Sequence, residues 1–193
     1  MTTLDDVETD GRRRRAQDSR ARIVAAMLDL TQAGQVSVSA ELVAERAKVG
    51  LRTVFRHFKD MDSLYREMSL IIEARLNREI EMSFSAQDWR GRLKDLILRR
   101  TTAFEIITPY KRAEAAHRHR SRFLEQDIGR LNTRLREVLR GVLPASAVED
   151  AASFEILDLL LSFESWDRLR REQGLSPDQA RLALEQAAER LLG

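Results

Sequence analysis

Apolar residues recur at intervals of three and four along most of this chain, the spacing that places them on one face of an α-helix. The first clear run is Ile23, Ala26, Met27 and Leu30, and comparable runs continue almost to the C-terminus. Only eight glycines and three prolines occur in 193 residues, so few positions would interrupt a helix. The pattern predicts an all-α fold without a sheet.

The residues needed for common catalytic and metal sites are scarce. The chain has no cysteine, which excludes disulfides, thiolate metal sites and a cysteine nucleophile. His117 and His119 are two residues apart and would diverge on a helix, and His57 is remote in sequence. No glycine-rich phosphate loop or G-x-S-x-G turn occurs. We therefore expect no enzyme activity, no cofactor and no bound metal.

The sequence also lacks the marks of export or membrane insertion. Its N-terminal stretch has no apolar core of the signal-peptide kind, and nowhere do about eighteen apolar residues run together. We expect a cytoplasmic protein that does not bind a membrane.

The net charge of +2 hides an uneven distribution along the chain. Residues 1–10 carry four acids and no base, residues 11–58 carry ten Lys or Arg against four acids, and the remainder is neutral. Positive charge confined to one N-terminal segment is typical of a surface that contacts nucleic acid.

Residues 1–17 have almost no apolar content, so we expect them to form a disordered basic tail. Its arginines are Arg12, Arg13, Arg14 and Arg15. They could reach the minor groove of DNA, or they could be a solvated charge block without a partner.

Three helices are predicted after this tail. The first runs from Ser19 to about Ala33, the second is capped by the hydroxyl of Ser39, and the third lies between Gly50 and Asp60. The third helix divides by face. Its expected buried stripe is Leu51, Val54, Phe55 and Phe58, and its expected free face is Arg52, Thr53, Arg56 and His57.

Two short helices joined by a three-residue turn are typical of a helix-turn-helix, whose second helix enters the major groove. Arg52 and Arg56 are four residues apart, and a guanidinium can bond O6 and N7 of guanine together. Thr53 and His57 can bond phosphate oxygens. The alternative from this pattern alone is an amphipathic helix with a solvated basic face.

The segment from Leu42 to Leu64 resembles the DNA-binding segment of the tetracycline-repressor (TetR) family. The positions that match the family pattern are Val43, Ala44, Ala47, Val49, Thr53, Phe58 and Leu64. The chain departs from the pattern where Lys48 replaces the turn glycine, Gly50 the serine cap, Phe55 a tyrosine and Met61 a lysine. The last two changes remove two typical phosphate contacts, and we expect Lys59, His57 and the tail arginines to compensate. A shifted register in the turn is the competing explanation of these departures.

The resemblance implies a repressor that binds a palindromic, double-stranded operator as a homodimer and is released by an unknown small-molecule effector. It implies a helix-turn-helix domain at 18–65, with the motif itself at about 42–61, and a larger helical domain for effector binding and dimerisation at 66–193. The DNA-contacting residues expected are Ser39, Lys48, Arg52, Thr53, Arg56, His57 and Lys59, together with the tail arginines.

The C-terminal half is expected to contain helices at 89–107, 110–142, 146–171 and 177–192, with Pro109 separating the first two. The resemblance implies that the last two helices form the dimer interface, and the candidate residues on them are Leu157, Leu161, Leu184, Ala187 and Leu191. The alternative is that the 146–171 helix is a core helix of a monomer.

The candidate effector-binding residues are Phe104, His117, Phe123 and Trp166. For His117, a role as a buried core residue is the alternative. Two other functions remain open at the level of sequence: a constitutive DNA-binding protein without an effector, and a helical adaptor that binds other proteins.

Overall fold

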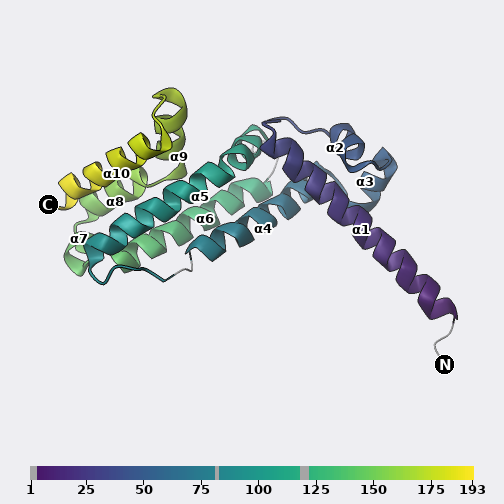
Figure 1. Cartoon of the computed structure of the whole chain (residues 1–193), viewed down its shortest axis with the longest axis horizontal. Helices are drawn as coiled ribbons and strands as arrows, with labels where there is room; N and C mark the ends of the chain where they lie inside the picture. Colours follow the sequence, from purple (N-terminus) through teal and green to yellow (C-terminus); the bar gives the residue numbers. More distant parts are fainter. Residues whose placement is uncertain (1–3, 81–82, 118–121) are drawn as a thin grey trace. The chain divides into compact units, whose positions relative to one another are not determined.

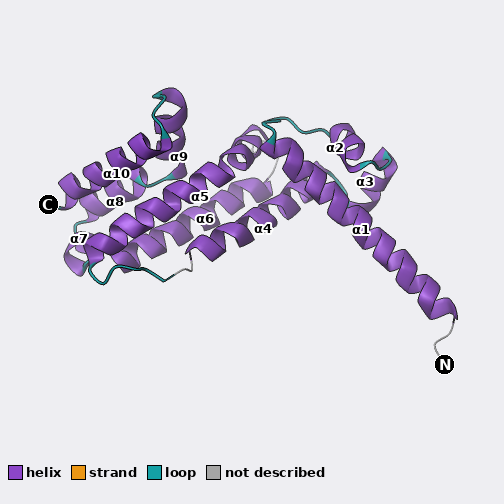
Figure 2. Cartoon of the chain, viewed as in Figure 1, coloured by secondary structure: helices purple, strands orange, loops and turns teal. Residues whose placement is uncertain are grey.

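The computed structural model describes the backbone of residues 4–80, 83–117 and 122–193, and the side chains of residues 14, 16–77, 83–117 and 129–193. Throughout these ranges every regular element is a helix, as Figure 2 shows. The prediction of an all-α fold is confirmed.

The helices follow one another with short connections (Figure 1). They are α1 (Leu4–Gln32), α2 (Ala40–Ala47), α3 (Leu51–His57), α4 (Met61–Ile80), α5 (Trp89–His117), α6 (Arg122–Val142), α7 (Ala145–Glu149), α8 (Ala151–Leu160), α9 (Phe163–Asp167), the π-helical turn η2 (Arg168–Glu172) and α10 (Pro177–Leu192). The chain forms two compact units: Met1–Ile72 with Pro109–Glu125, and Glu73–Thr108 with Gln126–Gly193.

In the first unit, α1 presents its apolar stripe to the short helices that follow it. Ile23, Met27 and Leu30 are buried, as their spacing predicts. Thr31 is buried at the same end, and its hydroxyl donates a hydrogen bond to the carbonyl of Met27 at 2.8 Å. Gly34 adopts φ +88°, a conformation that glycine tolerates, and lies two residues beyond the end of the helix.

The N-terminal boundary of α1 differs from the sequence prediction. Residues 4–17, expected to be disordered, continue the helix to Leu4. The segment contains no proline, and its acidic residues precede its basic residues. That order suits the helix dipole, which is positive at the N-terminus, so the segment extends a helix that the buried stripe already stabilises.

α2 and α3 form the predicted helix-turn-helix. The hydroxyl of Ser39 accepts a hydrogen bond from the amide of Leu42 at 3.3 Å and caps α2, as predicted. α2 ends at Lys48, which adopts φ 53° and ψ 48° and is the one described non-glycine residue with a positive φ. This is the position at which the family pattern has glycine, so the turn keeps its left-handed backbone although the residue has changed.

α5 is longer than predicted. It continues through Pro109 to His117, where the sequence had suggested a break. Proline removes one backbone hydrogen bond from a helix interior. Ile107, Tyr110 and Ala113 are buried on either side of Pro109, and this burial favours a continuous helix.

The helix predicted at 146–171 is instead α7, α8, α9 and η2. Asp150 and Ser162, which a single helix would have placed in its interior, act as N-caps. The Asp150 carboxylate accepts from the amide of Ser153 at 3.3 Å, and the Ser162 hydroxyl accepts from the amide of Ser165 at 3.2 Å. Such residues compete with helix continuation by bonding the backbone locally, which is why the segment divides here.

We expect Lys48→Gly to stabilise the protein by about 0.5 to 1 kcal/mol. Removing the Cβ from a residue in the left-handed conformation stabilises the folded state by about 1 to 2 kcal/mol. The greater conformational freedom of glycine in the unfolded chain offsets about 0.4 to 1 kcal/mol of this gain. The melting temperature should rise by about 1 to 4 °C. Lys48→Ala is the matched control, because it removes the same charge but keeps the Cβ. Equal melting temperatures for the two variants would contradict the strain at Lys48.

Candidate nucleic-acid interface

α3 carries a basic surface and is anchored by two side chains. Val54 and Phe58 are buried in the first unit, with 1% and 2% of their surfaces exposed. Arg52 and Arg56 are both exposed, as predicted, and Thr53 is half-buried. The anchors fix which side of α3 faces solvent, so the two arginines are presented from one face of a positioned helix.

The predicted buried stripe of α3 needs a correction at two positions. Leu51 and Phe55 are 39% and 47% exposed, whereas the sequence pattern had placed them in the core. A seven-residue helix that packs through one side needs only two anchors, and Val54 and Phe58 provide them. Phe55 occupies the position of the family's phosphate-contacting tyrosine, and that alignment pointed to an exposed residue. Both side chains can contact thymine methyl groups from this surface.

Arg20 of α1 holds the C-terminal end of α3. Its Nη1 donates to the carbonyl of His57 at 3.1 Å, and its Nη2 donates to Oε2 of Glu67 on α4 at 2.8 Å. The guanidinium also lies 4.4 Å from the centre of the Phe58 ring. A single side chain thus contacts α3, the residue that ends it and α4, and sequence analysis had assigned it only to the general basic charge.

His57 is in an environment that disfavours its charged form. Partial burial lowers the pKa of the imidazole below its ordinary value of 6.5, and the charges of Arg56 and Arg20 lower it further. Its Nε2 is buried without a hydrogen-bond partner. The imidazole is therefore neutral at neutral pH, and a nearby anion would favour its protonation by offsetting the neighbouring arginines.

The other predicted DNA-contacting residues lie on the same unit. Ser39, Lys48 and Lys59 are exposed. Arg14 is exposed on α1, whereas the side chains of Arg12, Arg13 and Arg15 lie outside the described residues. The amide of Ser63 donates to Asp60 Oδ1 at 2.8 Å, and this bond caps α4 directly after the recognition segment.

In the second unit, α5 and α6 enclose a small cavity, here called the α5–α6 cavity. Its lining residues are Leu76, Phe84, Leu96, Arg99, Arg100, Ala103, Phe104, Leu131, Leu135 and Val138. Its volume is about 20 Å³, room for a single water molecule. Phe104, one of the predicted effector-binding residues, lines it and packs edge-on against Phe163 with the ring centres 5.7 Å apart.

The remaining predicted effector-binding residues have other surroundings. His117 belongs to the first unit and stacks on Tyr65, with ring centres 4.3 Å apart. Trp166 is buried in the second unit, and its indole Nε1 donates to Glu105 at 2.9 Å. Phe123 lies outside the described side chains. Neither His117 nor Trp166 lines the α5–α6 cavity, and sequence analysis missed the charged lining residue Arg100.

The residues predicted for the dimer interface differ in how far the single chain already covers them. Leu157, Leu161 and Leu184 are buried within the single chain, and Ala187 and Leu191 are half-buried. The large apolar side chains that α8 and α10 expose are Ile156, Leu159 and Leu182. The face that the sequence pattern selected on these helices is therefore largely covered within the single chain.

Two further observations concern only the part of the chain that the structure describes. No group of three or more His, Asp or Glu side chains there is arranged to hold a metal ion. No helix within the same ranges combines the length and the apolar character that a membrane crossing requires.

No protein-family model matches the chain, and no curated protein matches it. Among solved structures, a TetR-family transcriptional regulator from a Rhodococcus species has a TM-score of 0.67 at 18% identity, covering 91% of this chain and 99% of its own. A TetR regulator from Rhodococcus sp. RHA1 has a TM-score of 0.58 at 18% identity, covering 91% and 96%. A transcriptional regulator from Streptomyces coelicolor has a TM-score of 0.54 at 19% identity, covering 90% and 97%.

These matches define the fold. The chain has the fold of TetR-family transcriptional regulators over about nine-tenths of its length. The resemblance inferred from the helix-turn-helix segment is confirmed at that level.

The lowered pKa of His57 leads to a test by pH titration. Because the folded pKa is below the unfolded value of 6.5, the stability that neutral His57 contributes is present above pH 6.5 and is lost as the pH falls through the folded pKa. Arg56→Gln should raise the pKa of His57, measured from its imidazole resonances by NMR. Arg168→Gln, an exposed site in the second unit, is the control. An unchanged His57 pKa in Arg56→Gln would refute the electrostatic coupling.

Proposed function

We propose that this chain is a transcriptional repressor of the TetR type. In this proposal a homodimer binds a palindromic operator in double-stranded DNA in the cytoplasm, and a small-molecule effector releases it. The observation that carries the proposal is the helix-turn-helix of α2 and α3, from which Arg52 and Arg56 project side by side while Val54 and Phe58 anchor the helix.

In this proposal, different residues would recognise the DNA bases and contact the DNA phosphates. Arg52 and Arg56 would bond guanine edges, with Leu51 and Phe55 against thymine methyl groups. Lys48, Lys59 and the hydroxyl of Ser39 would contact phosphates, together with Thr53 and His57. His57 would gain a proton on binding, because phosphate charge offsets Arg56 and Arg20.

The exposed apolar residues of α8 and α10 support the homodimer. Ile156 and Leu159 are 48% and 65% exposed, and Leu182 on the neighbouring helix is 53% exposed. A second copy of the same two helices would cover these side chains in a two-fold arrangement, and two-fold symmetry matches a palindromic operator.

The effector would bind in the α5–α6 cavity and act through α4. Leu76 of α4 lines the cavity, and the same helix begins at Met61, four residues after the end of α3. A ligand that displaces Leu76 therefore acts on a helix joined to the recognition helix by a short connection. Such coupling must be reciprocal, so operator DNA would weaken effector binding by the factor by which the effector weakens DNA binding.

The DNA-binding proposal is tested with an operator selected by mapping bound sites across the genome. Arg52→Ala and Arg56→Ala should each weaken operator binding by about 1 to 3 kcal/mol in fluorescence anisotropy and relax the preference at one base pair per half-site. Arg168→Ala, which removes an exposed arginine from the second unit, should leave the affinity unchanged.

Two results would count against the proposal. A variant that keeps the wild-type ratio of operator to scrambled-DNA affinity would rule out base reading by that arginine. A wild-type protein whose DNA affinity does not fall steeply with salt would contradict nucleic-acid binding altogether, since phosphate contacts release counterions.

The dimer proposal is tested by placing a charge on the exposed apolar surface. Ile156→Glu and Leu159→Glu should convert the dimer to a monomer in sedimentation experiments and weaken binding to the full palindrome, because the second half-site is lost. Leu98→Glu is the matched control, as Leu98 is 46% exposed on α5. If Leu98→Glu dissociates the dimer and the other two variants do not, the interface does not lie on α8.

A further inference from the structure

Arg100 is a cation in the interior of the second unit. It belongs to α5, and only 4% of its surface is exposed. Its Nη1 donates to the carbonyl of Leu161 at 3.3 Å, and its Nη2 donates to the carbonyl of Leu135. Its Nε is buried and has no hydrogen-bond partner. A buried N–H without an acceptor is costly, so this atom calls for an explanation.

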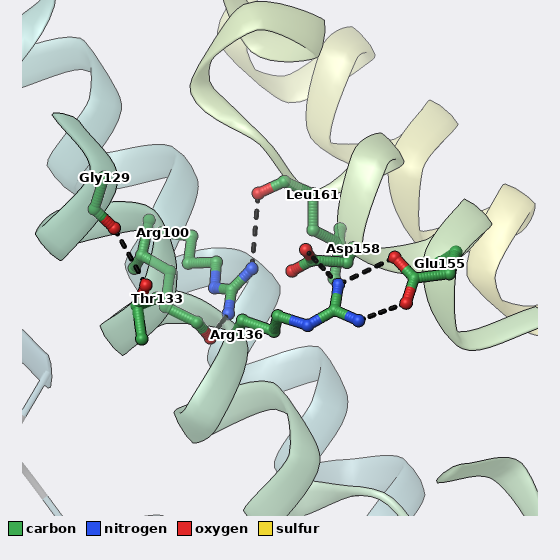
Figure 3. Close-up of polar contacts among 8 residues, drawn as sticks. Arg100, Gly129, Thr133, Arg136, Glu155, Asp158 and Leu161 are labelled. Carbon is green, nitrogen blue, oxygen red and sulfur yellow. Dashed lines mark hydrogen bonds and ion pairs between the residues drawn. The ribbon is translucent and has the colours of Figure 1, made fainter. Parts of the chain in front are cut away.

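The charge of Arg100 also has no counter-ion among the described residues. The nearby carboxylates are taken by another arginine: Arg136 donates from Nη1 to Asp158 at 3.0 Å and to Glu155 at 2.8 Å, and from Nη2 to Glu155 (Figure 3). Burial lowers the pKa of Arg100 to about 10, with a small opposing effect of Asp158, so the group stays charged at neutral pH. Among the described residues this buried positive charge has no ion-pair partner, and its printed hydrogen bonds go to two carbonyl oxygens.

This charge lies at the wall of the α5–α6 cavity, whose lining is otherwise mostly aliphatic and aromatic. Arg99, the second charged lining residue, donates from Nη2 to the carbonyl of Ser83 at 2.6 Å and lies over the ring of Phe84. Nη1 and Nη2 of Arg100 each have a carbonyl partner, in Leu161 and Leu135, whereas its buried Nε has none. An apolar cavity with a buried polar group in its wall is the usual design of a small-molecule site.

We propose that this cavity binds a molecule with an apolar body and one carboxylate, and that the carboxylate accepts a hydrogen bond from Nε of Arg100. The identification of this molecule as the effector rests on the proposed function above. A carboxylate would satisfy the free donor and neutralise the buried charge in one contact. Since the cavity volume is about 20 Å³, the ligand enters by displacing half-buried side chains at the rim, among them Phe84, Leu131 and Val138.

A purely structural role for Arg100 makes a different prediction. Leu161 is the residue that ends α8, so the guanidinium could serve only to cap that helix and join it to α6 through Leu135. In that case the cavity would have no preference between an acid and the corresponding alcohol. The two roles are separated by measuring that preference.

The probes are decanoate and naphthoate, each paired with its neutral counterpart, decanol and naphthylmethanol. Calorimetry on the full chain should give an affinity for each acid roughly ten- to a hundredfold higher than for its alcohol, the size expected of a hydrogen bond to a charged group. Including one aliphatic and one aromatic acid distinguishes the two kinds of apolar body. Failure of both acids to bind better than their alcohols would overturn the proposal.

Variants assign the preference to one residue. Arg100→Met keeps the side-chain length without the charge and should bring the ratio of acid to alcohol affinity to about one. Arg100→Lys keeps a charge without the Nε donor and should retain only part of the preference for acid over alcohol. This variant replaces Arg100→Met in the test if the methionine variant does not fold. Arg168→Met, which changes an exposed arginine outside the cavity, should keep the wild-type ratio. A full preference in folded Arg100→Met or Arg100→Lys would overturn the role of Nε.

Operator release is measured separately, by anisotropy with the same four probes. Release by the alcohols as strongly as by the acids would overturn the ligand class and leave the repressor function intact. Acid binding that depends on Arg100 but leaves operator affinity unchanged would support the site and contradict the effector response of the proposed function.

Discussion

The contacts of Arg20 determine where the basic surface of the helix-turn-helix can point. One guanidinium bonds the last carbonyl of α3, contacts the ring of Phe58 and pairs with Glu67 on α4. Each contact alone is modest, because the charges are partly exposed to solvent. Together with the burial of Val54 and Phe58, they fix the end of this seven-residue helix. The exposure of Arg52 and Arg56, and the lowered pKa of His57, follow from this arrangement.

Sequence patterns were sufficient for the helix-turn-helix because its determinants are local. The hydroxyl of Ser39, the carboxylate of Asp60 and the left-handed turn at Lys48 act within a few residues, and the Ser39 cap is found where it was predicted. The errors at Leu51 and Phe55 have one cause. Periodicity assigns every apolar residue on one stripe to the interior, but a short helix buries only the residues that its neighbours reach.

Prediction from sequence was weaker in the C-terminal half, because contacts between residues far apart in the chain determine which side chains are buried there. The spacing of Leu157, Leu161 and Leu184 cannot show whether the chain's own core or a second copy covers them, since both surroundings favour the same residues. The cavity was missed for a similar reason. Arg100 is one of 33 basic residues, and only the folded chain shows that two carbonyls hold it in the interior without a carboxylate.

Pro109 has a mechanical consequence for the longest helix of the C-terminal half. α5 extends over 29 residues, and the division between the two compact units falls between Thr108 and Pro109. Proline has no amide hydrogen, so one backbone hydrogen bond of the helix is missing at this point. The backbone hydrogen bonds make a helix resist bending, so a bend concentrates where one of them is missing. In α5 this missing hydrogen bond lies at the boundary between the two compact units.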